Sequence, residues 1–158
     1  MKLSDLLIKE AYQGVRPRWV APILNDEKGE MILMANSLRL PWNTIQQAFL
    51  KAELVTLERS IWSAMKNTDS TGNINMAEIR TWEETKDVDG ILDALKTGKA
   101  LAAPMVLIHE GVPYCVAGNT RLSIAKVLGI VPKVLLATTG KSESRAASSL
   151  SPKQKRIL

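Results

Sequence analysis

The chain of 158 residues contains one cysteine, one histidine and no long apolar run. A single cysteine, Cys115, excludes an internal disulfide and a cysteine-based zinc site. A single histidine, His109, excludes a metal site built from several histidines. The apolar runs, such as residues 134–137, are far shorter than the roughly 20 residues that span a membrane, and the first residues lack the apolar segment of a signal peptide. We therefore expect a cytoplasmic protein with no disulfide and no membrane partner.

The positive charge of the chain is concentrated near its C-terminal end. Residues 141–158 contain five basic residues and one acidic residue, a net charge of +4, whereas residues 1–140 contain 16 basic and 15 acidic residues, a net charge of +1. A basic segment attracts nucleic acid without sequence specificity, although it often serves only as a solvated end. Residues 140–158 are therefore predicted to be a basic, loosely ordered tail and a candidate contact for DNA.

The chain begins with a short segment that has the pattern of a helix. Ser4 or Asp5 can cap a helix that runs to about Tyr12. This helix is expected to turn Leu6 and Leu7 toward the core.

The rest of the N-terminal region has patterns for two strands and a long helix. Residues 18–24 and 30–35 are predicted to be strands around the polar turn 25–29. Residues 41–65 are predicted to be one long helix, because a proline suits its first turn and apolar residues recur at helical spacing. We therefore expect residues 1–73 to form an N-terminal extension of a helix, a hairpin and a long helix.

Residues 74–139 alternate between strand and helix patterns and are predicted to form the core of an α+β protein with a small mixed sheet. Asp87 or Asp89 can cap a helix that Gly98 ends, and Glu110-Gly111 is a hairpin signal. The predicted elements are a strand at 74–82, the helix through 95, strands at 105–109 and 113–117, a helix at 120–128 ended by Gly129, and a strand at 132–137.

The most informative segment is Gly118-Asn119-Thr120-Arg121, between a predicted strand and a predicted helix. Gly118 permits a tight turn, and Asn119 or Thr120 can cap the helix. The N–H groups at a helix start attract anions, and Arg121 in the first turn opposes the helix dipole unless an anion is bound. The segment therefore predicts a phosphate site, with an exposed arginine on an ordinary turn as the alternative.

The order of elements around this segment resembles the ParB/sulfiredoxin superfamily. A strand opened by Pro104, a glycine hairpin, a short strand, Gly-Asn-Thr-Arg, a helix and a final strand follow in the family's sequence, within residues 74–137. The resemblance implies that Gly118 and Arg121 contact the phosphates of a nucleotide, such as ATP, ADP or CTP, and that Asn119 and Thr120 line the loop. It also suggests a stand-alone ParB-like protein of the tailed-phage type, which would act in the cytoplasm of a bacterial host.

The segment departs from the family pattern in ways that restrict its chemistry. Asn119 stands where sulfiredoxins have their nucleophilic cysteine, which argues against sulfinic acid reduction. Ser123 stands where ParB proteins have a later arginine, and no helix-turn-helix domain follows. We therefore do not expect a chromosome-partition protein of the full type.

Phosphoryl transfer would also need a carboxylate as a base or as a Mg²⁺ ligand. Glu83 and Glu84 lie early in the predicted core, where related kinases place a catalytic glutamate, and they are the candidates. Solvated surface acids are the alternative. A Cys115–His109 dyad is disfavoured, because a two-residue hairpin turn places the two side chains on opposite faces of the sheet.

Three functions remain open from the sequence. The first is a nucleotide-binding protein, with Mg²⁺ and with phosphoryl transfer or nucleotide hydrolysis as its possible chemistry. The second is a DNA-associated protein or nuclease that uses the basic tail. The third is a non-catalytic module that binds another protein.

Overall fold

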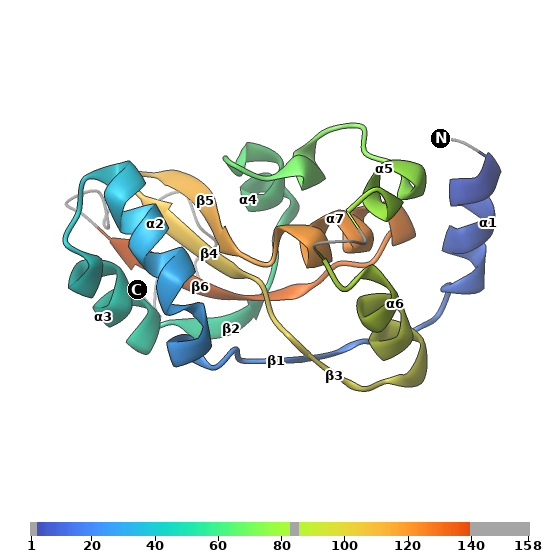
Figure 1. Cartoon of the computed structure of the whole chain (residues 1–158), viewed down its shortest axis with the longest axis horizontal. Coiled ribbons are helices and arrows are strands. Elements are labelled where there is room, and N and C mark those ends of the chain that lie inside the picture. Colours follow the sequence, from blue (N-terminus) through green and yellow to red (C-terminus); the bar gives the residue numbers. More distant parts are fainter. Residues whose placement is uncertain (1–2, 83–85, 140–158) are drawn as a thin grey trace.

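The computed structural model describes residues 3–82 and 86–139. This part of the chain has the expected mixed α+β architecture, with helices at both ends of a small mixed sheet (Figure 1). The helices are α1 (Leu3–Ala11), α2 (Lys28–Leu38), α3 (Trp42–Leu50), α4 (Arg59–Ala64), α5 (Met76–Arg80), α6 (Val88–Thr97) and α7 (Asn119–Leu128), with 3-10 turns η1 (Leu24–Glu27) and η2 (Asp69–Thr71). The strands are β1 (Arg18–Val20), β2 (Glu53–Thr56), β3 (Ala100–Ala102), β4 (Met105–His109), β5 (Val112–Ala117) and β6 (Lys133–Thr139).

The main sheet has four strands in the order β2-β6-β4-β5. β4 pairs antiparallel with β5 and parallel with β6, and β2 pairs antiparallel with the other edge of β6. The predicted hairpin is confirmed: His109 pairs with Val112 across Glu110 and Gly111, which both have positive φ, at 52° and 79°. Two residues with positive φ give the turn twist that suits adjacent antiparallel strands. A second, two-stranded sheet pairs β1 with β3 in parallel.

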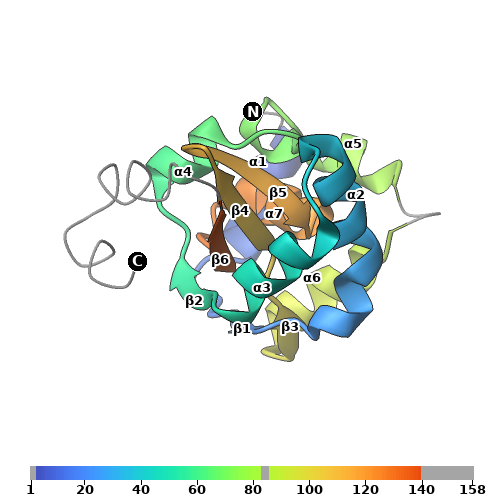
Figure 2. The same ribbon diagram turned by 90° about the vertical axis from the view of Figure 1, so that its left-hand side faces the viewer.

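The central strand β4 is buried on both faces, and its alternating side chains separate two parts of the core. Met105 and Leu107 pack with residues of α2 and α3, whereas Val106 and Ile108 pack with residues of α4 and α7. Successive strand side chains point to opposite faces, so one strand serves both clusters. The sheet accordingly lies between α2 and α3 on one side and α4 on the other (Figure 2).

A third apolar cluster forms the end of the molecule at which α5, α6 and α7 gather (Figure 1). It contains Ile79 of α5, Leu95 of α6, Ile124 of α7 and Trp19 of β1. The predicted C-terminal ends of two of these helices are confirmed, because Gly98 follows α6 and Gly129 follows α7 as the C-cap, each with positive φ.

The predicted N-terminal hairpin is wrong. Residues 28–38 form the single helix α2, which includes the predicted strand 30–35, and only residues 18–20 of the predicted strand 18–24 form β1. Met31, Met34 and Ala35 are buried, and their spacing of three and four residues places them on one helical face. Methionine and alanine are also good helix formers, so packing and propensity agree on a helix.

The predicted long helix at 41–65 is also wrong. The helix α3 ends at Leu50, and residues 53–56 form β2 before α4 begins at Arg59. The backbone of β2 pairs with β6, a strand about 80 residues further along the chain. Its place in the sheet depends on that long-range partner, and no glycine or proline marks the end of α3.

Residues 74–82 were predicted to be a strand, but residues 76–80 form helix α5. The side chain of Asn75 accepts a hydrogen bond from the backbone N–H of Glu78 and caps the helix, at 3.0 Å. Met76 and Ile79, three residues apart, are both buried. The cap and the spacing together favour a helix over the alternation of Ile74 and Met76 that suggested a strand.

The first predicted helix is confirmed as α1, but its predicted inward face is wrong. Leu6 and Leu7 are 43% and 57% exposed, whereas Asp5 is buried and accepts a hydrogen bond from the backbone N–H of Met76 at 2.9 Å. The helix therefore turns Asp5 toward α5. No helix within residues 3–82 and 86–139 has the length and apolar character needed to cross a membrane.

Candidate functional site

The predicted phosphate segment lies where β5 meets α7. β5 ends at Ala117, Gly118 is the N-cap with φ of 94°, and α7 begins at Asn119. The expected cap by Asn119 or Thr120 is therefore wrong: both residues lie inside the helix, and the cap has no side chain. The first intrahelical hydrogen bond runs from the N–H of Leu122 to the carbonyl of Gly118. The N–H groups of residues 119–121 precede it and have no acceptor within the helix.

Gly118 is required at this turn for two reasons. Its φ of 94° is a conformation that residues with a side chain rarely adopt. A Cβ atom at this position would also lie 2.8 Å from both Cα and Cβ of Pro104. The turn therefore packs directly against the residue that precedes β4, and this contact fixes the start of α7.

The start of α7 opens into a cavity of about 370 Å³, which we call the Arg121 cavity. Its walls come from segments that are far apart in the sequence. The lining residues are Glu27, Glu30, Asn67, Lys86, Asp87, Ile91 and residues 115–121. A volume of this size is within the range of small-molecule sites.

Arg121 is partly buried at this cavity. Its Nη1 donates a hydrogen bond to the carbonyl oxygen of Ala102, at the end of β3. Burial lowers the pKa of the Arg121 guanidinium, and the nearby charge of Glu27 opposes this effect. Within residues 3–82 and 86–139, no carboxylate forms an ion pair with Arg121. Arg121 is therefore not fully exposed, in contrast to the surface arginine of the alternative interpretation.

Asn119 lines the same cavity, but its amide is largely engaged in holding the η2 turn. Its Oδ1 accepts hydrogen bonds from the Thr68 hydroxyl at 2.6 Å and from the Asp69 N–H at 2.9 Å, and its Nδ2 donates to the Asp69 carboxylate at 3.1 Å. Thr120 is buried, with 8% of its surface exposed. Of the four predicted residues, Gly118 therefore forms the turn and Arg121 lines the cavity. Asn119 mainly holds the η2 turn, and Thr120 is buried.

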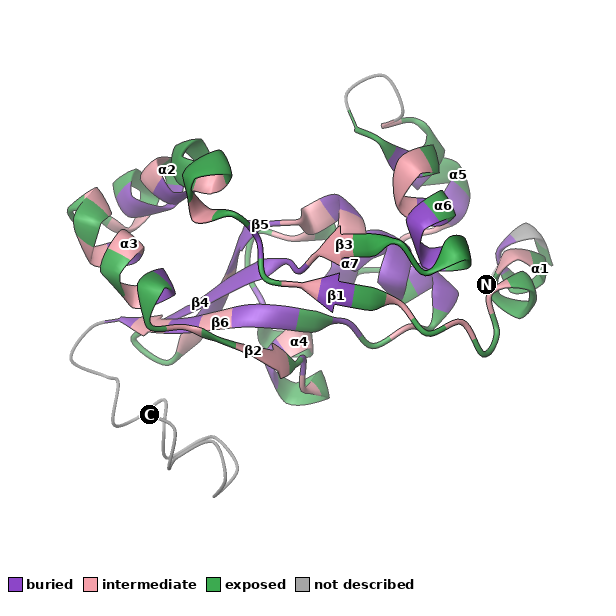
Figure 3. Ribbon diagram, turned by 90° about the horizontal axis from the view of Figure 1, so that it is seen from below, coloured by how far each residue is buried: buried purple, intermediate pink, exposed green. Residues whose placement is uncertain are grey.

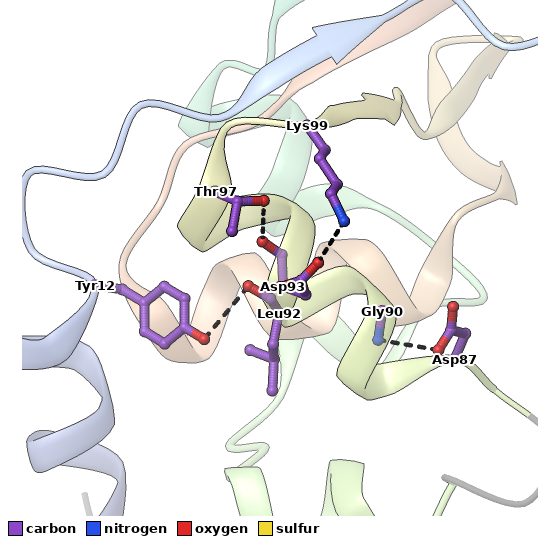
Figure 4. Close-up of polar contacts among 7 residues, drawn as sticks. All are labelled: Tyr12, Asp87, Gly90, Leu92, Asp93, Thr97 and Lys99. Atoms are coloured by element: carbon purple, nitrogen blue, oxygen red, sulfur yellow. Dashed lines mark hydrogen bonds and ion pairs between the residues drawn. The ribbon is translucent and has the colours of Figure 1, made fainter.

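The carboxylates of the Arg121 cavity differ from the predicted pair. Glu83 and Glu84 lie outside the described residues. The cavity instead contains Glu27 and Glu30, from the region of η1 and α2, together with Asp87. Asp87 also caps α6, because its Oδ1 accepts a hydrogen bond from the Gly90 N–H at 2.9 Å (Figure 4). Glu27 and Glu30 carried no sequence signal for this role, since about 90 residues separate them from Arg121.

Cys115 and His109 do not form a dyad, as the hairpin register predicts. Cys115 pairs with Val106 and packs in the cluster beneath α7, whereas His109 Nδ1 lies 2.9 Å from the Thr139 hydroxyl. Burial raises the pKa of the Cys115 thiol to about 12. A thiol that retains its proton at neutral pH is a poor nucleophile.

Comparisons of the chain with protein-family models, with curated proteins and with solved structures find no match. The resemblance to the ParB/sulfiredoxin superfamily therefore rests on the order of the motifs alone. The case for a function depends on the geometry of the Arg121 cavity.

Proposed function

We propose that the protein binds the phosphate groups of a nucleotide in the Arg121 cavity. This proposal rests on one observation: two features that attract anions lie at the same cavity. The N–H groups at the start of α7 lack intrahelical acceptors, and the Arg121 guanidinium lies within the same turn of helix. Both interact favourably with a phosphate oxygen, and the contact with a charged guanidinium is the stronger type.

The burial of Arg121 supports a role beyond that of a surface charge. Removing a guanidinium from water costs free energy, and the single hydrogen bond to the Ala102 carbonyl uses only one of its five N–H groups. A positive charge in the first turn also opposes the dipole of α7. A bound phosphate would offset both costs, because it would lie between the guanidinium and the helix N-terminus.

The other charges of the cavity favour a nucleotide that arrives with Mg²⁺. Lys86 and Arg121 face three carboxylates, those of Glu27, Glu30 and Asp87, so the lining is net negative. A divalent cation would relieve the repulsion between these carboxylates and a polyphosphate. In the described segments no group of three or more acidic, histidine or cysteine residues is arranged to hold a metal by itself. This fits the usual mode of Mg²⁺, which binds one or two carboxylates together with the phosphates.

The decisive experiment is calorimetric titration of the full chain with ATP, ADP, CTP and GTP, each with and without Mg²⁺. We expect saturable binding of at least one nucleotide and a higher affinity with Mg²⁺. Arg121→Gln should weaken that binding by roughly tenfold or more, the usual worth of a charge-assisted contact. Arg121→Lys should recover part of the loss, because a point charge cannot reproduce the planar guanidinium.

Two further variants, one control outside the cavity and one within its lining, separate the loss of a ligand contact from the loss of the fold. Arg59→Gln removes an exposed arginine that does not line the Arg121 cavity, and it should bind as the parent does. Lys86→Gln removes an exposed charge of the cavity lining, and it should weaken binding without a change in thermal stability. Equal affinity of the parent, Arg121→Gln and Lys86→Gln would contradict the site. No saturable binding of any nucleotide would contradict the function.

A further inference from the structure

A second and larger cavity lies at the other end of α7. Its volume is about 680 Å³, and we call it the α1 cavity. Its walls are the last turn of α1, the segment that leads from α1 to β1, and the residues that follow α7. Figure 3 shows α1 and this connecting segment at one end of the molecule, beside the start of β1. The cavity shares no lining residue with the Arg121 cavity.

Contacts made by three lining residues hold the walls of the α1 cavity in place. The Tyr12 hydroxyl donates a hydrogen bond to the carbonyl of Leu92, at 3.4 Å, and so fastens the end of α1 to α6 (Figure 4). A side chain at Gly129 would collide with the Lys9 side chain, so Lys9 lies close against the backbone at the end of α7. These two contacts join the C-terminal end of α1 to α6 and to the end of α7, so the wall that α1 contributes is anchored to two other helices.

The lining combines apolar side chains with an excess of positive charge. Leu6 and Val131 are 43% and 59% exposed, although they are apolar, and Trp19 and Leu128 lie deeper. The charged lining residues are Lys9, Arg16 and Lys133, which are basic, and Glu10, which is acidic. No ion pair joins any of the three cations to a carboxylate in the described part of the chain. Lys9 also offsets the negative end of the α7 dipole, which leaves Arg16 and Lys133 as the main source of positive potential.

Trp19 adds a polar group that lacks a partner. Its Nε1 is buried and has no hydrogen-bond partner within the described residues. An unpaired buried N–H is destabilising, because it has lost its contact with water. Trp19 also lines the cavity, where its indole ring adds apolar surface while its Nε1 stays covered by the protein.

We propose that the α1 cavity binds a small amphipathic carboxylate, a molecule with an apolar body and one anionic group. The apolar body would cover the exposed Leu6 and Val131, and the carboxylate would interact with Arg16 and Lys133. A cavity of 300–1,000 Å³ with a mainly apolar lining and a few polar groups is typical of such ligands. Charge complementarity selects the anion over a neutral or cationic molecule of the same length.

The test uses octanoate as the probe and the full chain as the receptor. Calorimetric titration should give saturable binding of octanoate at one site. Octan-1-ol and octyltrimethylammonium have the same apolar chain but no negative charge, and they should bind at least about fivefold more weakly. Equal affinity for octanoate and octan-1-ol would show that the cavity selects only for apolar surface and would overturn the proposal.

Variants of the lining residues test whether octanoate binds in the α1 cavity. Arg16→Glu/Lys133→Glu reverses the two main lining charges and should weaken octanoate binding by at least about fivefold. Lys51→Glu/Arg59→Glu changes the net charge equally at exposed residues outside the cavity and should have little effect. Leu6→Ser removes an exposed apolar side chain of the lining and should weaken octanoate and octan-1-ol alike.

The outcome does not depend on the function proposed for the Arg121 cavity, because the two cavities share no residues. Absence of saturable octanoate binding to the parent would overturn the proposal. An equal loss of affinity in the cavity double variant and in the control double variant would do the same, since it would show that only the net charge of the protein attracts the anion.

Discussion

Cys115 illustrates how its surroundings decide what a single residue can do. The side chain is 4% exposed and packs beneath α7, and its Sγ lies 3.7 Å from the carbonyl of Ala117. Burial disfavours the thiolate, since a charge without solvent is costly. The same thiol on the surface would be a potential nucleophile, but in this position it behaves as a small apolar side chain.

The first prediction follows from the raised pKa of Cys115, about 12 against an ordinary value near 9. Between these two values the unfolded chain releases the thiol proton and the folded chain retains it, so the free energy of unfolding falls as pH rises. From about pH 8 to about pH 10, the parent should lose about 1.4 kcal/mol more than Cys115→Ala. Urea unfolding of both proteins at several pH values measures this difference, and parallel pH profiles would contradict it.

The second prediction concerns Gly118. Gly118→Ala should destabilise the protein by at least about 2 kcal/mol, because it combines an unfavourable positive φ with a collision against Pro104. Gly111→Ala isolates the φ contribution, since Gly111 also has positive φ but open space around it. Gly29→Ala lies in α2 with ordinary φ and open space, and it should be neutral or slightly stabilising. Thermal unfolding of the three variants should give the order Gly118, Gly111, Gly29, and any other order would refute the close-packing argument.

At the scale of elements, α6 and α7 depend on the residues at their ends. α6 begins with the carboxylate of Asp87 and ends at Gly98, whereas α7 begins and ends at glycines. Asp87 was one of two residues expected to cap α6. The other, Asp89, lies within the helix and pairs with Arg80.

The third prediction tests the Asp87 cap. Asp87→Ala should lower the free energy of unfolding by about 1 kcal/mol, because the Gly90 N–H loses its acceptor. Asp87→Asn should retain most of the stability, since an asparagine oxygen also caps a helix. Asp93→Ala is the control: Asp93 forms an exposed ion pair with Lys99 at 2.9 Å (Figure 4), which contributes little. Equal stabilities of Asp87→Ala and the parent in urea unfolding would show that the cap contributes nothing.

The elements that sequence patterns predicted well are those with strong local signals at both ends. The β4–β5 hairpin has Glu110-Gly111 at its turn, and α7 has Gly118 before it and Gly129 after it. The predictions failed for two reasons: at residues 30–35 the turn signal at 25–29 outweighed the helical spacing of Met31, Met34 and Ala35, and at residues 53–56 no local signal marked a strand. For residues 53–56 the choice between helix and strand depended on the distant partner β6, which a local pattern does not contain.

At the scale of the whole molecule, the distribution of charge separates two parts of the chain. Residues 1–140 have a net charge of +1, whereas residues 141–158 have a net charge of +4. Any nonspecific attraction to nucleic acid therefore arises mainly from the last 18 residues. The DNA-associated function that we considered from the sequence depends on these residues.

The fourth prediction tests that function. A chain truncated after Gly140 should bind a short DNA duplex more weakly than the full chain, with a shallower dependence on salt, because fewer phosphate contacts release fewer counterions. Fluorescence anisotropy across a salt series measures both quantities, and nucleotide titration of the truncated chain serves as the control for a folded Arg121 cavity. Unchanged DNA affinity at every salt concentration would show that residues 141–158 do not contribute to DNA binding.

The sequence by itself determined the features that depend on local chemistry. These include the α+β class, the hairpin of β4 and β5, the glycine turn before α7 and the absence of a Cys115–His109 dyad. The class follows from the alternation of strand and helix patterns along residues 74–139. The other features follow from residues within a few positions of one another, because turn geometry and strand alternation act over that range.

Only the tertiary structure decided which residues surround Arg121. Glu27, Glu30, Asn67 and Asp87 reach this cavity from separate segments, and Ala102 supplies the carbonyl that holds the guanidinium. The α1 cavity is likewise assembled from α1, β1, β2 and the end of α7. Such neighbours are set by the packing of helices on the sheet, which brings together residues that share no local pattern in the sequence.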